Sequence, residues 1–457
     1  MKYFLVFSIF ITQILSAQEV KSKLDSAVAQ FLKTEAMSAG QLSFYVADEA
    51  GEPVYEYMPN LGLSSASTQK IFTAAAALDI LGKDFKYTTT ASHSGTINDG
   101  VLDGNLFIHS NGDPTLGSWR YLEKKSDDFK DKLLAVLTEK GIKKVNGDIV
   151  IDDSYFDFQK VPGGWSWDDI GNYYGAGVWG VNWRENQFDI HATGNLVKSY
   201  APELVGVKWV NDVETGGSGD NSFVFTAPFS DVAYINGTLP GKKVTTVAGA
   251  MPNPPLQLAV EISNWLKKSE IEFTGKTTTT SLQRINGEKI TYAPKGNTIL
   301  EFKSPAMEKI VYWFMQKSVN LYGETLLKTI GKTRKGDSRY GESITALKDF
   351  WASKGIKKSA INFADGSGLS PQNYVSSKAE VQALLYAQKR AWFPEFQESF
   401  PTYNSMKMKS GTIKNTKSYA GYHASKEGKN FVFSIIINNY QGSNANAALF
   451  KILDNLK

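Results

Sequence analysis

The sequence predicts an α/β protein in which both ends of the chain build one core domain, a sheet flanked by helices, and the middle of the chain is inserted into it. Helical and strand patterns occur together near both ends, whereas the stretch from about residue 83 to residue 293 is rich in short strands, Gly, Asp and Asn. Hydrophobic residues make up 42% of the chain and charged residues 21%, as in ordinary globular proteins. A length of 457 residues is enough for roughly three compact units.

The beginning of the chain resembles a secretory signal. Lys2 precedes an apolar run that ends near Ala17, and Gln13 interrupts this run before it reaches the about 20 apolar residues of a membrane span. We expect residues 1–17 to be a signal peptide that is cleaved after Ala17. The mature protein is then exported to the periplasm and has no transmembrane segment.

The elements of the core domain follow from local patterns. Leu24, Val28 and Phe31 have helical spacing, two strands fit within residues 41–57, and an alanine-rich helix is entered at Ser67. In the C-terminal part we expect a helix capped by Ser304, a helix that begins after the segment 318–320, three strands and a closing amphipathic helix, at residues 304–315, 321 onward, 405–413, 418–423, 431–438 and 445–456. The closing helix is expected to pack against the sheet.

The insertion contains two strong helical patterns, at residues 127–140 and 256–268. Each leads through a Gly or Lys turn into a strand, and a similar unit occurs at residues 347–363. The Gly-rich segment 215–222 is the best exposed-loop signal, and it favours a small nested subdomain. We therefore predict a core domain, an inserted domain and a nested small domain, at residues 18–82 with 294–457, 83–185 with 247–293, and 186–246.

The composition excludes several classes of function. Cysteine is absent, so the chain has no disulfide, thiolate metal cluster or cysteine nucleophile. The four histidines lie far apart, at His93, His109, His191 and His423, which argues against a zinc hydrolase. A net charge of +4 is too small for a chain of this length to indicate a nucleic-acid partner. We expect neither a metal nor a cofactor.

Ser67 and Lys70 are a candidate nucleophile and base. Three residues apart on a helix, their side chains emerge on one face within reach of each other, and the helix N-terminus favours developing negative charge. Lysine can accept the serine proton only if it is neutral, which requires burial or a second cation nearby. For this pair alone, the simpler interpretation is a serine that caps the helix and a lysine that is exposed to solvent.

Two further motifs supply the missing groups. Lys409 is a candidate second cation on a strand, and Ser410, Gly411 and Thr412 follow it with two hydroxyls and a residue that allows close approach to the backbone. Ser318 and Asn320 offer a proton relay and an amide at a break between helices. For each of these two motifs alone, the simpler interpretation is an ordinary edge strand or an ordinary helix cap. The three motifs in this order along the chain are nevertheless a strong indication of a serine active site.

With these motifs the chain resembles the penicillin-recognising serine D,D-peptidases, whose core is an antiparallel sheet flanked by helices. The stretch between Ser67 and Ser318 is far longer than in a simple β-lactamase. It is similar to that of the class C low-molecular-mass penicillin-binding proteins, D-alanyl-D-alanine carboxypeptidases and endopeptidases that carry nested domains there. Further matching segments extend the resemblance over most of the mature chain, at residues 112–116, 147–152, 164–169, 365–370 and 419–422.

The resemblance implies a role for each motif. Ser67 would be acylated by the D-alanyl carbonyl, Lys70 would act as the base, and Ser318 would pass the proton to the leaving amine. Asn320 would hold the substrate amide. The carboxyl end of the substrate would meet Lys409 and the hydroxyls of Ser410 and Thr412, and the backbone N–H groups of Ser67 and Thr412 would form the oxyanion hole.

Family members that bind a free diamino-acid end carry an acidic residue and an aromatic residue five positions later in the insertion. Asp169 and Tyr174 occupy the matching places, although a turn aspartate and a core tyrosine would look the same. Pro371 stands where the family often has an arginine that meets the diamino-acid carboxylate. Its neighbours Gln372 and Asn373 could offer only neutral hydrogen bonds.

We therefore expect an exported serine-type D-Ala-D-Ala carboxypeptidase, which could also be an endopeptidase. Its partners are peptidoglycan stem peptides that end in D-Ala-D-Ala, and β-lactams are expected to acylate it. Two alternatives stay open: a β-lactamase or esterase on the same core, which would need a carboxylate that activates water, and a non-catalytic protein that binds cell-wall peptides.

Overall fold

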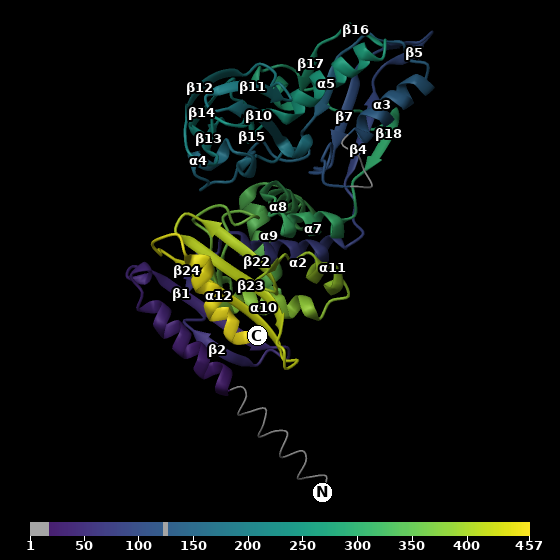
Figure 1. Cartoon of the computed structure of the whole chain (residues 1–457). Helices are drawn as coiled ribbons and strands as arrows, with labels where there is room; N and C mark the ends of the chain where they lie inside the picture. The colour runs from purple at the N-terminus through teal and green to yellow at the C-terminus, as the bar shows by residue number, and fades with distance from the viewer. Residues whose placement is uncertain (1–17, 122–126) are drawn as a thin grey trace. The chain divides into compact units, whose positions relative to one another are not determined.

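The computed structural model describes residues 18–121 and 127–457, which divide into two compact units (Figure 1). The first unit contains the chain up to Leu81, Val311–Ser318 and Ile344–Lys457, and the second contains Gly82–Ile310 and Val319–Ser343. Both ends of the chain therefore contribute to the first unit. The predicted signal peptide lies outside the described residues.

A six-stranded sheet forms the centre of the first unit, with every pair of neighbouring strands antiparallel. Its order is β2, β1, β24, β23, β22, β21, which span Pro53–Tyr57, Gln41–Asp48, Asn430–Asn438, Thr416–Ala424, Met406–Ile413 and Thr402–Tyr403. The central strand β24 is a nearly continuous apolar run because both of its faces are buried. This antiparallel sheet with its helices confirms the predicted fold class.

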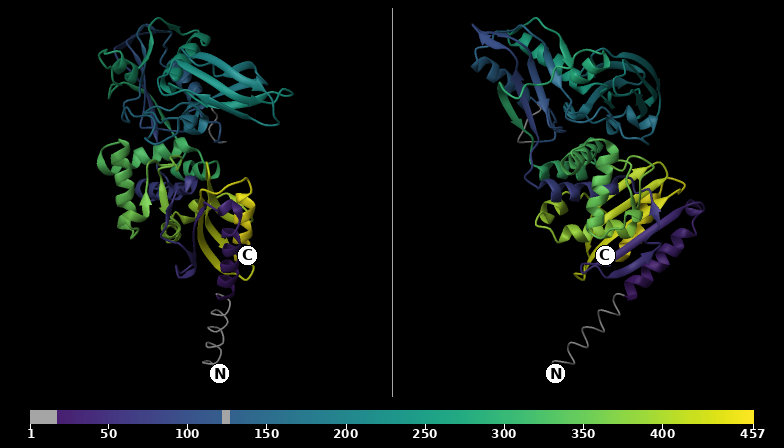
Figure 2. Two further views of the ribbon diagram at one scale, coloured as in Figure 1. Left: turned by 90° about the vertical axis from the view of Figure 1, so that its left-hand side faces the viewer. Right: turned by 180° about the vertical axis from the view of Figure 1, so that it is seen from behind.

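Helices cover both faces of this sheet (Figures 1 and 2). The helix over residues 18–32 and α12, Ala445–Leu453, pack Leu24, Val28 and Leu449 against sheet residues on one face. On the other face lie α10, Ser377–Gln388, and α2, Lys70–Leu81, which contact each other. Strand β22 reaches this second face beside the turn that leads into α2.

The C-terminal part of the chain contains the expected helices with shifted ends, and two more, α10 and α11, that the sequence did not predict. They are α7, α8, α9, α10, α11 and α12, at Met307–Gln316, Asn320–Lys335, Tyr340–Ser353, Ser377–Gln388, Phe393–Glu398 and Ala445–Leu453. The expected Ser304 cap is wrong. The Ser304 hydroxyl accepts from the Tyr87 N–H and donates to the Pro305 carbonyl, and α7 begins only at Met307.

The second unit contains two of the three predicted helix–turn–strand units, and the third, at residues 347–363, lies in the first unit. The helix α3, Asp128–Glu139, leads into β8 and β9, and α5, Pro254–Lys268, leads into β16 and β17. The two copies pair in parallel, β8 with β16 and β9 with β17. The strands of the two sheets built around them are β17-β9-β7-β4-β18 and β16-β8-β6-β5, at Thr277–Thr279, Ile149–Asp152, Leu106–Ser110, Thr88–His93, Thr298–Lys303, and Glu272–Phe273, Lys144–Val145, Val101–Asp103, Thr96–Asn98.

Residues 187–250 of the second unit form two small sheets with a core of their own. Their strands are β11-β10-β15 and β12-β14-β13, at Leu196–Ala201, Gln187–Thr193, Thr245–Ala250, Lys208–Thr215, Val232–Leu239 and Asn221–Phe225. The predicted loop of residues 215–222 joins β12 to β13. The division of the insertion into two domains stays a prediction.

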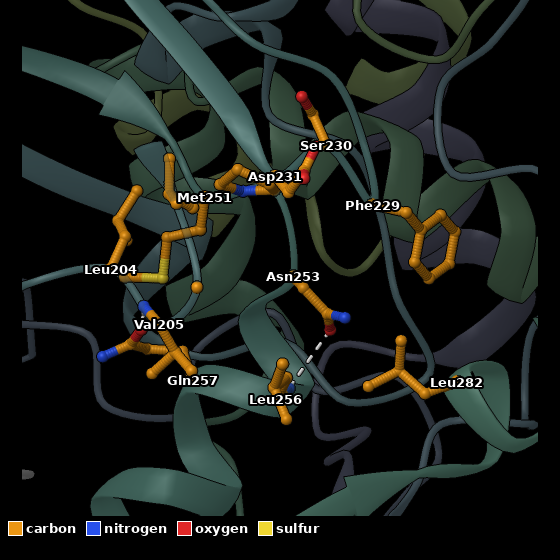
Figure 3. A pocket seen from close by; sticks show the side chains of 13 residues that line it. Leu204, Val205, Phe229, Ser230, Asp231, Met251, Asn253, Leu256, Gln257 and Leu282 are labelled. Carbon is orange, nitrogen blue, oxygen red and sulfur yellow. Dashed lines mark hydrogen bonds between the residues drawn. The ribbon is translucent and has the colours of Figure 1, made fainter. Parts of the chain in front are cut away.

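A small cavity of about 150 Å³ lies next to this core, at the beginning of α5 (Figure 3). Leu204, Met251 and Leu282 give it a mostly apolar lining. Asn253 caps α5 at its rim by accepting the Leu256 N–H at 3.1 Å. Asp231 is its single charged lining residue, so the cavity offers little chemistry.

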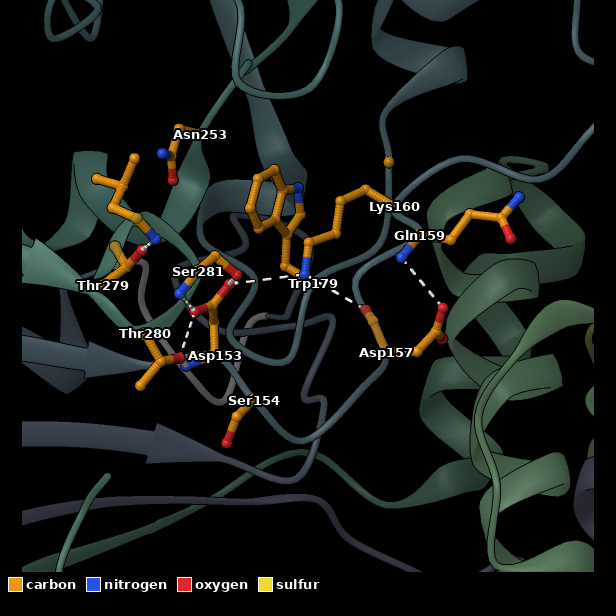
Figure 4. A network of polar contacts seen from close by, with 12 residues as sticks. Asp153, Ser154, Asp157, Gln159, Lys160, Trp179, Asn253, Thr279, Thr280 and Ser281 are labelled. Atoms are coloured by element: carbon orange, nitrogen blue, oxygen red, sulfur yellow. Dashed lines mark hydrogen bonds and ion pairs between the residues drawn. The ribbon is translucent and has the colours of Figure 1, made fainter. Parts of the chain in front are cut away.

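A buried polar network lies elsewhere in the second unit (Figure 4). The Asp153 carboxylate accepts hydrogen bonds from the Thr280 hydroxyl and from both the N–H and the hydroxyl of Ser281, at 2.7, 2.9 and 2.5 Å. The Lys160 ammonium lies 3.6 Å from Asp153 and over the Trp179 ring. Burial lowers the pKa of Lys160, against the attraction of Asp153.

Candidate active site

Ser67 lies on a single 3-10 turn that connects β3, Gly62–Leu63, to α2. This turn, η2, spans Ala66–Gln69, and Ala66 has a left-handed φ of 48°. Lys70 is the first residue of α2 and is fully buried. Its Nζ atom lies 2.9 Å from the Ser67 Oγ atom, so the structure places the candidate nucleophile and base in direct hydrogen-bond contact.

The Lys70 amine is also held from the opposite side. It donates to the Ser367 carbonyl at 2.7 Å and lies 5.6 Å from the centre of the Phe314 ring. Ser367 belongs to the segment 365–370, to which sequence reasoning assigned no role. The structure shows that its backbone fixes the direction of the Lys70 side chain.

The Asp365 carboxylate organises this loop. It accepts the N–H groups of Gly368 and Ser370 at 2.7 and 2.6 Å, and the Asn373 side-chain amide at 2.9 Å. Gly368 has a φ of +84° and lies against the Ala66 carbonyl, where a side chain would collide. Asn373 is buried and serves the loop, so its amide is committed within the protein.

Lys409 on β22 is buried with 2% exposure, and its ammonium donates to the Ser410 carbonyl at 2.9 Å. Burial lowers its pKa well below the usual range, and the positive charges of Lys70 and Lys417 add to the effect. Because Coulomb repulsion is mutual, two such close ammonium groups cannot both be protonated without cost. The pair favours a state in which one of the two amines is neutral.

The segment after Lys409 lies against the backbone of the nucleophile. A side chain on Gly411 would meet the Ser65 carbonyl, the Ser418 hydroxyl and the Ser67 N–H. Ser410 is half-buried, and the exposed Thr412 accepts a hydrogen bond from Lys417 through its hydroxyl. The backbone of Ser67 is therefore close to the strand that carries Thr412, as an oxyanion hole of two N–H groups requires.

The buried carboxyl group of Glu380 is hydrogen-bonded to η2, the turn that carries Ser67. Thr68 donates to Glu380 at 2.7 Å and to the Ser65 carbonyl at 3.0 Å, and Ser434 donates to the other oxygen of Glu380 at 2.6 Å. Burial raises the pKa of Glu380 to about 7, and the two hydroxyl hydrogen bonds lower it in part. Sequence reasoning missed Glu380, since a Glu within a helical pattern gives no sign of burial.

Ser318 lies between α7 and α8 in the first unit, with a left-handed φ of 56°. Among the described residues, no hydrogen bond joins its hydroxyl to Ser67 or Lys70. Asn320 is the first residue of α8 and belongs to the second unit. The roles of Ser318 and Asn320 stay predictions.

Asp169 and Tyr174 lie together in the second unit. Their side chains are half-buried and hydrogen-bonded to each other, and burial raises both of their pKa values. The Asn320 amide donates to the Tyr174 carbonyl at 2.8 Å. Within the second unit, Asn320 is thus hydrogen-bonded to the backbone of one of the two residues expected to line a pocket for a diamino acid.

The residues that the structure describes contain no cluster of histidine and acidic side chains that could hold a metal. Over the same part of the chain, no helix has the length and apolar character needed to cross a bilayer.

Known proteins resemble the chain over most of its length. A D-alanyl-D-alanine carboxypeptidase DacB of Haemophilus influenzae is 26% identical over 415 residues, which cover 85% of this chain and 83% of that protein. A D-alanyl-D-alanine carboxypeptidase of Actinomadura sp. is 25% identical over 460 residues, which cover 92% and 82%. The crystal structure of penicillin binding protein 4 from H. influenzae superposes with a TM-score of 0.78 at 23% identity, over 93% of this chain and 98% of that one, and so has the same fold.

A family model also matches the chain. The model of the D-Ala-D-Ala carboxypeptidase 3 (S13) family matches residues 24–456, nearly the whole described chain. The match includes Ser67 and the buried Lys70, Lys409 and the loop that orients Lys70. The chain belongs to the D-Ala-D-Ala carboxypeptidase 3 (S13) family of serine peptidases.

Proposed function

We propose that this protein is an exported serine-type D-Ala-D-Ala carboxypeptidase that trims peptidoglycan stem peptides through an acyl-enzyme on Ser67. The observation that carries the proposal is the 2.9 Å contact between the Ser67 hydroxyl and the fully buried Lys70 amine. Family membership and the two carboxypeptidase relatives support the same activity. The apolar run that ends near Ala17 supports export to the periplasm.

The proposed reaction starts with a neutral Lys70 amine. Repulsion between the Lys70 and Lys409 ammonium groups favours a state in which one of the two is neutral, and we assign the neutral state to Lys70. Lys70 takes the Ser67 proton as the Ser67 oxygen attacks the carbonyl of the penultimate D-Ala. The backbone N–H groups of Ser67 and Thr412 stabilise the oxyanion, and each such donor is typically worth about a hundredfold in rate or more. The terminal D-Ala then leaves as an amine.

Ser318 is proposed to relay the proton from Lys70 to the leaving amine. Water then attacks the ester on Ser67 and releases the shortened peptide, which returns the hydroxyl to Ser67. Asn320 is proposed to bind an amide of the peptide stem. Asp169 and Tyr174 are proposed to bind the amine of a diamino acid in that stem. Since Pro371 replaces the arginine expected in the family, the carboxylate of that diamino acid lacks an ion-pair partner at this position.

A β-lactam is proposed to acylate the same hydroxyl. Penicillin binding protein 4 of H. influenzae, which shares the fold, has been crystallised in complex with a β-lactam. The test is to incubate the purified protein with a fluorescent penicillin and, separately, with a peptide that ends in D-Ala-D-Ala. A Ser67→Ala variant is the matched control.

We expect stable labelling and D-alanine release by the wild type, and loss of both in the Ser67→Ala variant. Rapid turnover of the penicillin without D-alanine release would instead indicate a β-lactamase. A folded protein that neither labels nor releases D-alanine would indicate a binding protein. An additional assay with a cross-linked stem peptide measures endopeptidase activity.

A further inference from the structure

Lys417 is a third buried lysine near the site, in addition to Lys70 and Lys409. The proposed reaction assigns no role to it. It lies on β23 directly opposite Thr412 of β22 in the antiparallel register. Its ammonium donates to the Thr412 hydroxyl at 2.6 Å and lies 5.2 Å from the centre of the Tyr419 ring. The residue is only 9% exposed, so this cation is held in one place.

No carboxylate of the described residues forms an ion pair with Lys417. Burial lowers its pKa, and its charge also acts on the ammonium of Lys409. A buried cation without an anion costs free energy, and a bound anion would recover part of that cost. The surroundings of Lys417 therefore favour an anionic ligand.

The register shows where this anion would lie. Ser410 and Thr412 are two residues apart on β22, so their side chains point to the same face of the sheet. Lys417 reaches that face, because its ammonium contacts the Thr412 hydroxyl. These two hydroxyls are the groups that, by the family resemblance, would meet the carboxyl end of the substrate.

We propose that Lys417 is a carboxylate-binding residue that makes the enzyme specific for substrates with a free carboxylate next to the scissile amide. The inference rests on the proposed function. Lys417 would supply the positive charge for this carboxylate, and the Ser410 and Thr412 hydroxyls would set its orientation. A charge-assisted hydrogen bond is roughly twice as strong as a neutral one, so the charge decides between an acid and its amide.

The test compares two peptides, one that ends in D-Ala-D-Ala and the same peptide with a terminal carboxamide. The main variant is Lys417→Gln, which keeps an N–H donor for Thr412 but removes the charge. Lys417→Arg keeps the charge. Lys414→Gln is the matched control, because Lys414 is an exposed lysine in the turn between β22 and β23.

For Lys417→Gln we expect kcat/KM on the free acid to fall about tenfold to a hundredfold, mainly through KM, because one charge-assisted contact is lost. Cleavage of the carboxamide should stay unchanged, which also shows that the variant is folded. Lys417→Arg and Lys414→Gln should keep the preference of the wild type for the acid.

An unchanged acid-to-carboxamide ratio in Lys417→Gln would overturn the inference, as would an equal loss on both peptides. Failure of the proposed function is a separate result. In that case the wild type itself would release no D-alanine and Ser67 would not be labelled by penicillin.

Discussion

Among single residues, the buried Glu380 should have a measurable effect on how the free energy of unfolding depends on pH. Its pKa is raised to about 7 by burial, whereas an unfolded glutamate titrates near 4.5. Between these two values, unfolding releases a proton, so the free energy of unfolding falls as the pH rises from about 4.5 to about 7 and is level above that range. The total change amounts to about 3 kcal/mol.

We expect Glu380→Gln to remove this slope, because the amide does not titrate and can still accept a hydrogen bond from Thr68 or Ser434. Urea unfolding at pH 5 and pH 8 measures it. Between these two pH values the wild type should lose about 2.5 kcal/mol more than the variant. Equal pH dependence in the two proteins would show that Glu380 does not titrate in this range.

Some site residues can be predicted from the sequence and others cannot. Ser67 and Lys70 are close along the chain, so their spacing alone predicts that they meet. Lys417 contacts the site through strand pairing, Glu380 through a helix that packs under the turn, and Ser367 through its carbonyl oxygen. Such contacts depend on the packing of distant segments, and the residue type does not reveal them.

At the scale of elements, the approach of β22 to η2 is the packing that brings the motifs together. Gly411 makes it possible, because a methyl group there would overlap the Ser65 carbonyl and press on the Ser67 N–H. Backbone atoms cannot move aside as side chains do. Either the strand or the nucleophile turn would have to shift.

We therefore expect Gly411→Ala to slow acylation by fluorescent penicillin about a hundredfold or more, because the oxyanion donors would be displaced. Gly296→Ala is the control, since a side chain at Gly296 meets open space. The initial rate of labelling is the measurement. A Gly411→Ala variant that labels at the rate of the control would mean that this close approach is unnecessary.

Strands and helices of the core were predicted well where hydrophobic patterns set them, as for β1, β24 and α12. Their ends were less predictable. Ser304 followed by Pro305 is a typical helix start, but the Ser304 hydroxyl is already bonded to Tyr87, more than 200 residues earlier in the chain. A local signal was overridden by a tertiary contact.

At the scale of the whole molecule, stability depends on buried polar groups as well as on the apolar cores. In the second unit, Asp153 joins Lys160 to Thr280 and Ser281. The two charges of the buried pair are not equivalent. Asp153 has three hydrogen-bond donors besides Lys160, whereas Lys160 also lies over an aromatic ring.

We expect Asp153→Ala to lower the free energy of unfolding by about 3 to 5 kcal/mol, because it leaves a buried ammonium and the donors of Thr280 and Ser281 without their acceptor. Lys160→Met should cost much less, since the methionine can pack on Trp179 while Asp153 keeps its donors. Denaturant unfolding of both variants measures the difference. Equal losses would contradict this asymmetry.

The general architecture could be predicted from the sequence because composition and pattern change at the ends of the insertion. The exact units could not, since Val319–Ser343 lies within the C-terminal part of the chain yet belongs to the second unit. The hydrophobic pattern of α8 does not indicate which neighbour it packs against.

The pairing of β1 with β24 has a consequence for biogenesis. Gln41 lies opposite Asn438. Strand β1, which is synthesised early, can therefore pair with β24 only when the chain is almost complete. Closing such a long loop is slow in folding. A nascent chain therefore lacks the middle strand of its sheet until nearly the entire polypeptide has been made, and the sheet that carries Lys409 can be completed only then.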